Sequence, residues 1–117
     1  MNMNDHCELY SVMRGEDLKV DGSNFVDWYL CLRIVLKRRN ILFVIERHVG
    51  DPPADNIDEQ EIFDYYARQQ TYSIVKNVME LSMSHVLRDQ FEEKSAYDMV
   101  DTLKSMFFIS SELLDLS

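Results

Sequence analysis

Glycine, proline and cysteine are scarce in this chain, which has 3, 2 and 2 of them in 117 residues. Because tight turns use glycine and proline, their scarcity disfavours a sheet-rich fold and favours a few long helices joined by few loops. Cys7 and Cys31 lie far apart and form no CxxC pair, so neither a zinc site nor a disulfide framework is predicted. Cys31 is interpreted as a small buried hydrophobic residue, and the expected location is intracellular, in the cytoplasm or alternatively the nucleus.

Long apolar runs and basic charge are also lacking. No stretch of about 18 apolar residues is present, so no membrane span is expected, and residues 1–8 resemble neither a signal nor a transit peptide. The 12 Lys and Arg against 21 Asp and Glu give a formal net charge of -9. Since such a chain repels nucleic acid and anionic membranes over most of its surface, neither is an expected partner. The basic triplet at 37–39 is interpreted as a helix C-terminus, in preference to a phosphate patch.

Patterns that would support catalysis or metal binding are missing as well. His6, His48 and His85 do not have the i, i+4 spacing of helical metal ligands, so no metal site and no cofactor are predicted. No GxSxG motif occurs, and glycine is too scarce for an oxyanion loop or a phosphate-binding loop. The abundant carboxylates are interpreted as solvated helix starts and loops, because paired catalytic acids need a pocket to hold them. We therefore predict a protein that is not an enzyme and has no catalytic residues.

The chain does contain enough hydrophobic residues, 46% of the total, for one folded domain with one core. Residues 1–17 show weak periodicity and are predicted to form a flexible N-terminal segment. Residues 18–109 are predicted to form the helical domain, and residues 110–117 an apolar C-terminal tail.

The first predicted helix begins after an N-cap at Ser23 or Asn24, whose side-chain oxygen would accept a free backbone N–H. It ends near Asn40, a residue suited to a left-handed C-terminal turn. Leu30 and Ile34 lie on a flank of its apolar stripe, so this helix is expected to be buried on more than one side.

The second predicted helix begins at a capping box formed by Asp58 and Glu61 and runs to about Met83. Residues 85–91 predict another short helix, and the last helix begins at Ser95.

Residues 41–45 are apolar and β-branched, which makes a strand the local alternative. Because no partner strand is evident, a short buried helix or turn is preferred. Together these segments predict an all-α fold, a compact bundle of about four to five helices.

Apolar positions at helical spacing define the predicted core. The aromatic residues have acidic neighbours and no basic groove, so they are interpreted as packing residues and not as base-stacking platforms. Tyr65 and Tyr72 are assigned to the surface or to an interface. The predicted core consists of Phe25, Trp28, Leu32, Leu36, Ile62, Tyr66, Ile74, Val78, Leu81, Met99, Val100 and Leu103.

The residues around the first helix follow a known pattern. Plant copia-type retrotransposon Gag proteins open with the sequence G-x-N-[YF]-x-x-W followed by a helix. The residues that match it are Gly22, Asn24, Phe25 and Trp28. Residues 41–45, with the two prolines after them, are similar to the next segment of that family. The chain thus resembles the N-terminal capsid region of these Gag proteins.

A third motif of the family, A-x-x-x-W-x-x-L-x-x-x-[YF], resembles residues 96–108, where Val100 replaces the usual Trp. Phe63 or Tyr66 stands where another Trp is common, and such apolar exchanges fit a repacked core. The second capsid lobe and the CCHC zinc knuckle of the family have no counterpart here. The chain is therefore expected to be a fragment or a shortened, domesticated copy that does not package RNA by itself.

The resemblance implies a helical lobe of the capsid N-terminal type that self-associates. The expected partner is a second copy in a homo-oligomer, in particular a dimer, or another Gag-like chain. We therefore predict a non-enzymatic module for protein–protein interaction and self-assembly. The alternative is a domesticated or truncated Gag-like adaptor or inhibitor that binds another protein.

The C-terminal residues are unusually apolar for a chain end. An exposed apolar cluster is a liability on a monomer, so these residues either pack on a second chain or fold back onto their own core. The first alternative makes them a candidate protein interface, which comprises Phe107, Phe108, Ile109, Leu113, Leu114 and Leu116.

Overall fold

The computed structural model describes residues 17–54 and 58–108. Its elements in chain order are α2 (Phe25–Arg38), the 3-10 helix η1 (Leu42–Ile45), α3 (Glu59–Leu81), α4 (His85–Arg88), the 3-10 helix η2 (Asp89–Phe91) and α5 (Ala96–Phe107). This part of the chain contains no strand, and Leu18 and Met83 form an isolated parallel β-bridge. The predicted all-α bundle is confirmed. Residues 1–16 of the predicted N-terminal segment and the predicted tail at 110–117 lie outside the described residues.

Helix α2 begins and ends where the sequence predicts, but its first turn is capped differently. The N-cap is Asn24, whose side chain makes no hydrogen bond to the first turn. Instead, Asn24 Oδ1 accepts from Lys19 N at 2.9 Å and Nδ2 donates to Asp17 O at 2.9 Å, so this side chain fixes the segment before the helix. At the other end, Asn40 has a φ of 60°, the left-handed conformation that was predicted. The basic triplet at 37–39 occupies the helix end, as expected.

The turn into α2 depends on Gly22, which has a φ of 71°. Glycine adopts this left-handed conformation without steric cost. A Cβ at this position would also overlap the ring of Phe107 from the end of α5. In the same turn, Asp21 accepts a hydrogen bond from Ser23 N at 2.9 Å, which lowers the pKa of the Asp21 carboxyl. The turn therefore combines a local cap with a close approach by α5.

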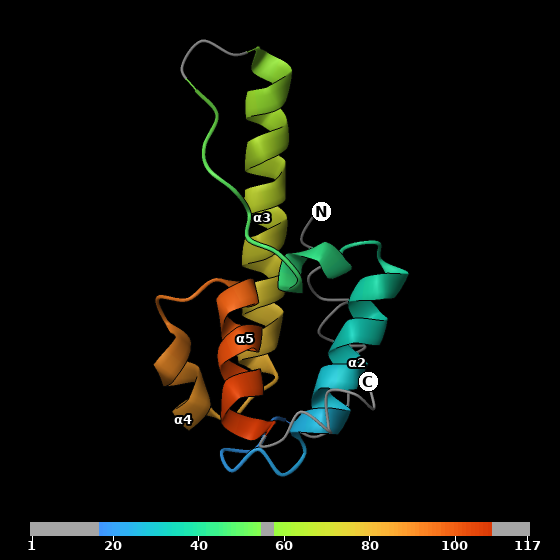
Figure 1. Cartoon of the computed structure of the whole chain (residues 1–117), viewed down its shortest axis with the longest axis vertical. Helices are drawn as coiled ribbons and strands as arrows, with labels where there is room; N and C mark the ends of the chain where they lie inside the picture. Colours follow the sequence, from blue (N-terminus) through green and yellow to red (C-terminus); the bar gives the residue numbers. More distant parts are fainter. Residues whose placement is uncertain (1–16, 55–57, 109–117) are drawn as a thin grey trace.

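Residues 41–45 form a short helix and not a strand. Element η1 has Val44 and Ile45 buried, and it contacts α2, α3 and α5. Figure 1 shows it between α2 and α3, near the middle of the molecule. The preferred prediction for this segment is confirmed.

Helix α3 begins as the capping box predicts, with Asp58 Oδ1 accepting a hydrogen bond from Glu61 N at 3.0 Å. It ends at Leu81, slightly before the predicted end at Met83. Its C-terminal half lies against the other helices, whereas its N-terminal half extends beyond them, accompanied by the chain segment that follows η1 (Figure 1).

The buried face of α3 differs from the predicted stripe. The residues that are buried are Tyr65, Tyr72, Val75, Val78 and Met79. Tyr66 and Leu81 are exposed, so their assignment to the core was wrong, and Ile62 and Ile74 are only partly buried. Placing Tyr65 and Tyr72 at the surface was also wrong. Successive side chains point about 100° apart on a helix. Tyr66, the predicted core position, therefore faces away from the segment after η1, which covers Tyr65.

The rest of the predicted core is buried as expected: Phe25, Trp28, Leu32, Leu36, Val78, Met99, Val100 and Leu103. Trp28 also joins distant segments, because its Nε1 donates to Ser82 O at 2.8 Å. The same carbonyl accepts from Leu18 N at 2.9 Å, and Ser84 N donates to Leu18 O at 2.8 Å. The indole N–H is thus satisfied inside the core, as a buried donor must be.

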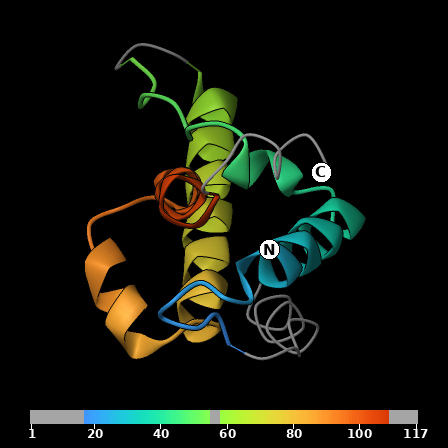
Figure 2. The same ribbon diagram turned by 60° about the horizontal axis from the view of Figure 1, so that its bottom comes forward.

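The predicted helix at 85–91 consists of α4 followed directly by η2. Helix α5 then begins after Ser95, whose Oγ accepts from Asp98 N at 3.2 Å. Figure 2 looks almost along α5. It shows α5 crossing α3, and α4 at the side of α3.

Candidate functional site

The predicted C-terminal interface begins at the end of α5. Phe107 and Phe108 are partly buried, with ring centroids 5.6 Å and 5.0 Å from that of Phe25. Phe108 also lies 6.1 Å from Tyr29 in an edge-on contact. These two residues therefore fold back onto their own core, as in the second alternative. The other four predicted interface residues lie outside the described residues, and they are Ile109, Leu113, Leu114 and Leu116.

An apolar surface that the sequence reading missed lies on α2. Val26, Leu30 and Ile34 are 43%, 41% and 52% exposed, and they follow one another at every fourth position. On a helix this spacing makes one row along one face. We refer to these three residues as the α2 face. Leu30 and Ile34 were predicted to be buried on a flank, which is wrong, because α2 packs on the bundle through the side that carries Leu32.

A second exposed apolar surface lies on the protruding half of α3. Phe63 is 68% exposed and Tyr66 is 60% exposed, and the two residues are one helical turn apart. We refer to them as the α3 aromatic pair. It is carried by a different helix from the α2 face, so these two apolar surfaces are separate.

A basic cavity lies between α3 and the segment that follows η1, with a volume of about 390 Å³. We refer to it as the basic–aromatic cavity, and its lining residues are Phe43, Arg47, His48, Val49, Arg68 and Tyr72. The guanidinium carbon of Arg47 lies 5.4 Å from the ring centre of Phe43, and that of Arg68 lies 6.0 Å from the ring centre of Tyr65. Both distances are within cation–π range.

Tyr72 holds the two sides of this cavity together. Its hydroxyl donates to Arg47 O at 2.8 Å, and its ring lies 5.9 Å from the ring of Phe43. Burial raises the pKa of Tyr72 above 10.0, while the charges of Arg47 and Arg68 act in the opposite direction. The phenol therefore stays protonated at neutral pH and keeps this hydrogen bond.

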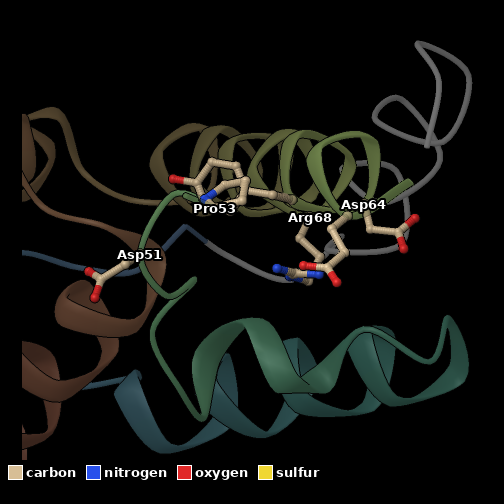
Figure 3. A pocket seen from close by; sticks show the side chains of 6 residues that line it. Asp51, Pro53, Asp64 and Arg68 are labelled. Carbon is tan, nitrogen blue, oxygen red and sulfur yellow. The ribbon is translucent and has the colours of Figure 1, made fainter. Parts of the chain in front are cut away.

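A neighbouring cavity of about 260 Å³ has the opposite charge. It is lined by Asp51, Pro53, Glu61, Asp64, Tyr65 and Arg68. Figure 3 shows Asp64 and Arg68 projecting from neighbouring turns of α3, with Asp51 set apart on the segment after η1. Asp64 Oδ1 accepts a hydrogen bond from Gln60 Nε2 at 2.9 Å. Arg68 thus stands between a basic and an acidic cavity.

The acidic and histidine side chains of the described residues do not form a metal-binding cluster. In the parts of the chain that the structure places, no three His, Cys, Asp or Glu side chains gather in a way that could hold a metal ion. None of the described helices is long and apolar enough to cross a lipid bilayer.

Comparisons with protein-family models, with curated proteins and with solved structures found no match for this chain. The resemblance to copia-type Gag proteins therefore rests on the motifs of the sequence alone.

Proposed function

We propose that this domain works by binding protein chains, first of all a second copy of itself, and that it has no enzymatic chemistry of its own. The α2 face is the observation that supports this proposal. Its three exposed aliphatic side chains lie in successive turns of α2. Among the described residues, α2 runs along the edge of the molecule (Figure 1). Contiguous exposed apolar residues of this kind mark interaction sites more often than scattered ones do.

Covering the α2 face supplies part of the free energy that association requires. Fully burying an aliphatic side chain contributes roughly 1.5–3 kcal/mol. Because Val26, Leu30 and Ile34 are each about half exposed, a partner would gain on the order of 1 kcal/mol per side chain. In a two-fold dimer both copies contribute the same residues, which doubles this gain.

The charges on α2 favour an antiparallel arrangement of two copies. Asp27 lies in the first turn, and Lys37 and Arg38 lie in the last turn. When two α2 helices pack antiparallel about Leu30, the acidic start of each lies beside the basic end of the other. The helix dipoles then oppose one another as well, whereas a parallel pair would place like charges together. An isologous dimer through the α2 face is therefore the arrangement we propose.

Light scattering and sedimentation equilibrium on the purified chain test the dimer. We expect Leu30→Asp with Ile34→Asp to convert it to a monomer, because two buried charges would meet at the two-fold axis. The matched control is Phe63→Asp with Tyr66→Asp, which adds the same charge to the α3 aromatic pair and should leave the dimer unchanged. A wild-type chain that stays monomeric at high concentration would contradict the proposal, as would a dimer that survives the α2 variant.

The C-terminal interface predicted from the sequence has its own variant, Leu113→Asp with Leu116→Asp. If this pair abolishes the dimer and the α2 variant does not, self-association uses the C-terminal tail and not the α2 face. The resemblance to the capsid lobe of copia-type Gag proteins also supports self-association. We extend the proposal accordingly to an intracellular capsid-like building block that associates with its own copies or with other Gag-like chains.

A second candidate function is that of an adaptor or inhibitor that binds a different protein. The α3 aromatic pair favours it, because a homodimer through α2 leaves that surface uncovered. Cross-linking and pull-down with the wild type and the two aspartate variants separate the candidates. Self-association predicts capture of the chain itself, lost in the α2 variant, whereas an adaptor predicts a different protein that is lost in the Phe63 and Tyr66 variant.

A further inference from the structure

The basic–aromatic cavity concentrates positive charge in a chain whose formal net charge is -9. Arg47 and His48 come from the segment after η1, and Arg68 comes from α3. In the described part of the chain, Arg33 pairs with Glu46 at 3.7 Å and Lys76 pairs with Glu80 at 3.9 Å. Within residues 17–54 and 58–108, therefore, neither Arg47 nor Arg68 forms an ion pair.

The Arg47 guanidinium lies over the ring of Phe43, which lines this cavity, and the Arg68 guanidinium lies over the ring of Tyr65, which lines the neighbouring cavity. A guanidinium that lies over an aromatic ring has its N–H donors in its own plane, directed away from that ring. This arrangement suits planar acceptors that bind through two atoms. Because Tyr72 bonds to Arg47 O, the backbone that carries Arg47 is also fixed relative to α3. The cavity is thus partly organised for an anion before any ligand arrives.

We propose that the basic–aromatic cavity binds a carboxylate of an acidic protein segment, with the apolar atoms beside that carboxylate resting on Phe43 and Val49. Arg47 and Arg68 are the groups that pair with the carboxylate oxygens. This is a binding activity separate from self-association, because the cavity belongs to α3, η1 and the segment after η1 and not to the α2 face.

The surroundings of the cavity favour a carboxylate over a nucleic acid strand. Asp51, Glu61 and Asp64 line the neighbouring cavity on the other side of Arg68. A chain of phosphates that followed Arg68 would meet these carboxylates, and the net charge of the protein repels a polyanion at longer range. A single carboxylate between the two arginines meets less of this repulsion than a chain of phosphates does.

The first test uses the wild-type chain and NMR titration. The first probe is a short peptide of alternating leucine and glutamate with both ends blocked. The second has glutamine in place of each glutamate. The third is the glutamine peptide with a free C-terminal carboxylate. We expect the glutamate peptide to shift the side-chain signals of Arg47 and Arg68, and the blocked glutamine peptide to have no effect. Binding of the third probe alone would assign the site to a chain-end carboxylate. Equal binding of the glutamate and blocked glutamine peptides would overturn the proposal.

Inorganic phosphate and a single-stranded oligonucleotide serve as competing anions in the same titration. Tighter binding of either one at Arg47 and Arg68 would overturn the assignment to an acidic protein segment. Because these arms use the unaltered protein, they do not depend on the folding of any variant.

The second test compares two variants with the same change of charge. Arg47→Gln with Arg68→Gln should weaken the glutamate peptide at least about tenfold, since charge-assisted hydrogen bonds to the ligand are lost. Lys19→Gln with Lys104→Gln removes the same charge before α2 and in the last turn of α5, outside both proposed binding sites, and should change binding less than about twofold, because salt screens distant charges. Equal losses in both variants would overturn the proposal. The α2 variant of the dimer test should bind the peptide normally, so failure of one proposal does not decide the other.

Discussion

The two halves of α3 show how differently one helix can be supported along its length. In residues 71–81 the side chains of Tyr72, Val75, Val78 and Met79 are buried against the rest of the bundle. In residues 59–70 the only buried side chain is that of Tyr65, and the helix rises beyond the other helices (Figure 1). The packed half is held by contacts with other helices, whereas the protruding half depends on its cap, on contacts one turn apart and on the burial of Tyr65 by the segment after η1.

The largest expected difference between the halves concerns core packing. Met79→Ala removes a fully buried side chain and should lower the free energy of unfolding by about 2–5 kcal/mol. Tyr66→Ala, in the protruding half, should change it by less than about 0.5 kcal/mol, because Tyr66 is exposed. Urea unfolding followed by circular dichroism measures both values. Similar losses in the two variants would show that the protruding half is packed as tightly as the other.

The N-cap at Asp58 should matter only to the protruding half. Asp58→Ala removes the hydrogen bond to Glu61 N and should destabilise the start of the helix by about 1 kcal/mol. Amide hydrogen exchange should then speed up in the first two turns of α3, while Val78 and its neighbours keep their protection. Asp58→Asn, which retains a capping oxygen, is the control. Faster exchange along the whole helix would mean that the halves are coupled.

Tyr72 lies at the junction of the halves, and its effect should be small and dependent on pH. Tyr72→Phe removes the hydrogen bond to Arg47 O and should lower the free energy of unfolding by about 0.5–1 kcal/mol at neutral pH. Because burial raises the pKa of Tyr72 in the folded chain, the unfolded chain, with a value of 10.0, loses this proton first. Its contribution is therefore present below pH 10 and is lost as the pH rises above it.

Urea unfolding of the wild type and of Tyr72→Phe, at neutral pH and above pH 10, measures this effect. The difference between the two proteins should shrink at the higher pH. Tyr66→Phe is the control, because Tyr66 is exposed. Within the described residues, its hydroxyl makes no hydrogen bond comparable to the one between Tyr72 and Arg47 O. A difference that stays constant across the titration would contradict the role assigned to the Tyr72 hydroxyl.

The candidate surfaces were harder to predict than the helices, for a physical reason. Val26, Leu30 and Ile34 are as apolar as the core residues of the same helix, and nothing in their spacing says which row faces outward. Arg47 and Arg68 line the same cavity although they are far apart in the sequence. No local sequence pattern specifies the turn of the chain that brings them to it. The acidic composition correctly describes most of the molecule but conceals this local exception.

The sequence by itself determined where the helices begin and end, because caps and turns act within a few residues. Asp58 accepts from Glu61 N, Ser95 accepts from Asp98 N, and Asn40 adopts a left-handed conformation, each as its local sequence predicts. Only the tertiary structure decided that Tyr65 is buried and Tyr66 exposed. Neighbouring positions on a helix have the same local preferences, and the segment that covers one of them comes from elsewhere in the chain.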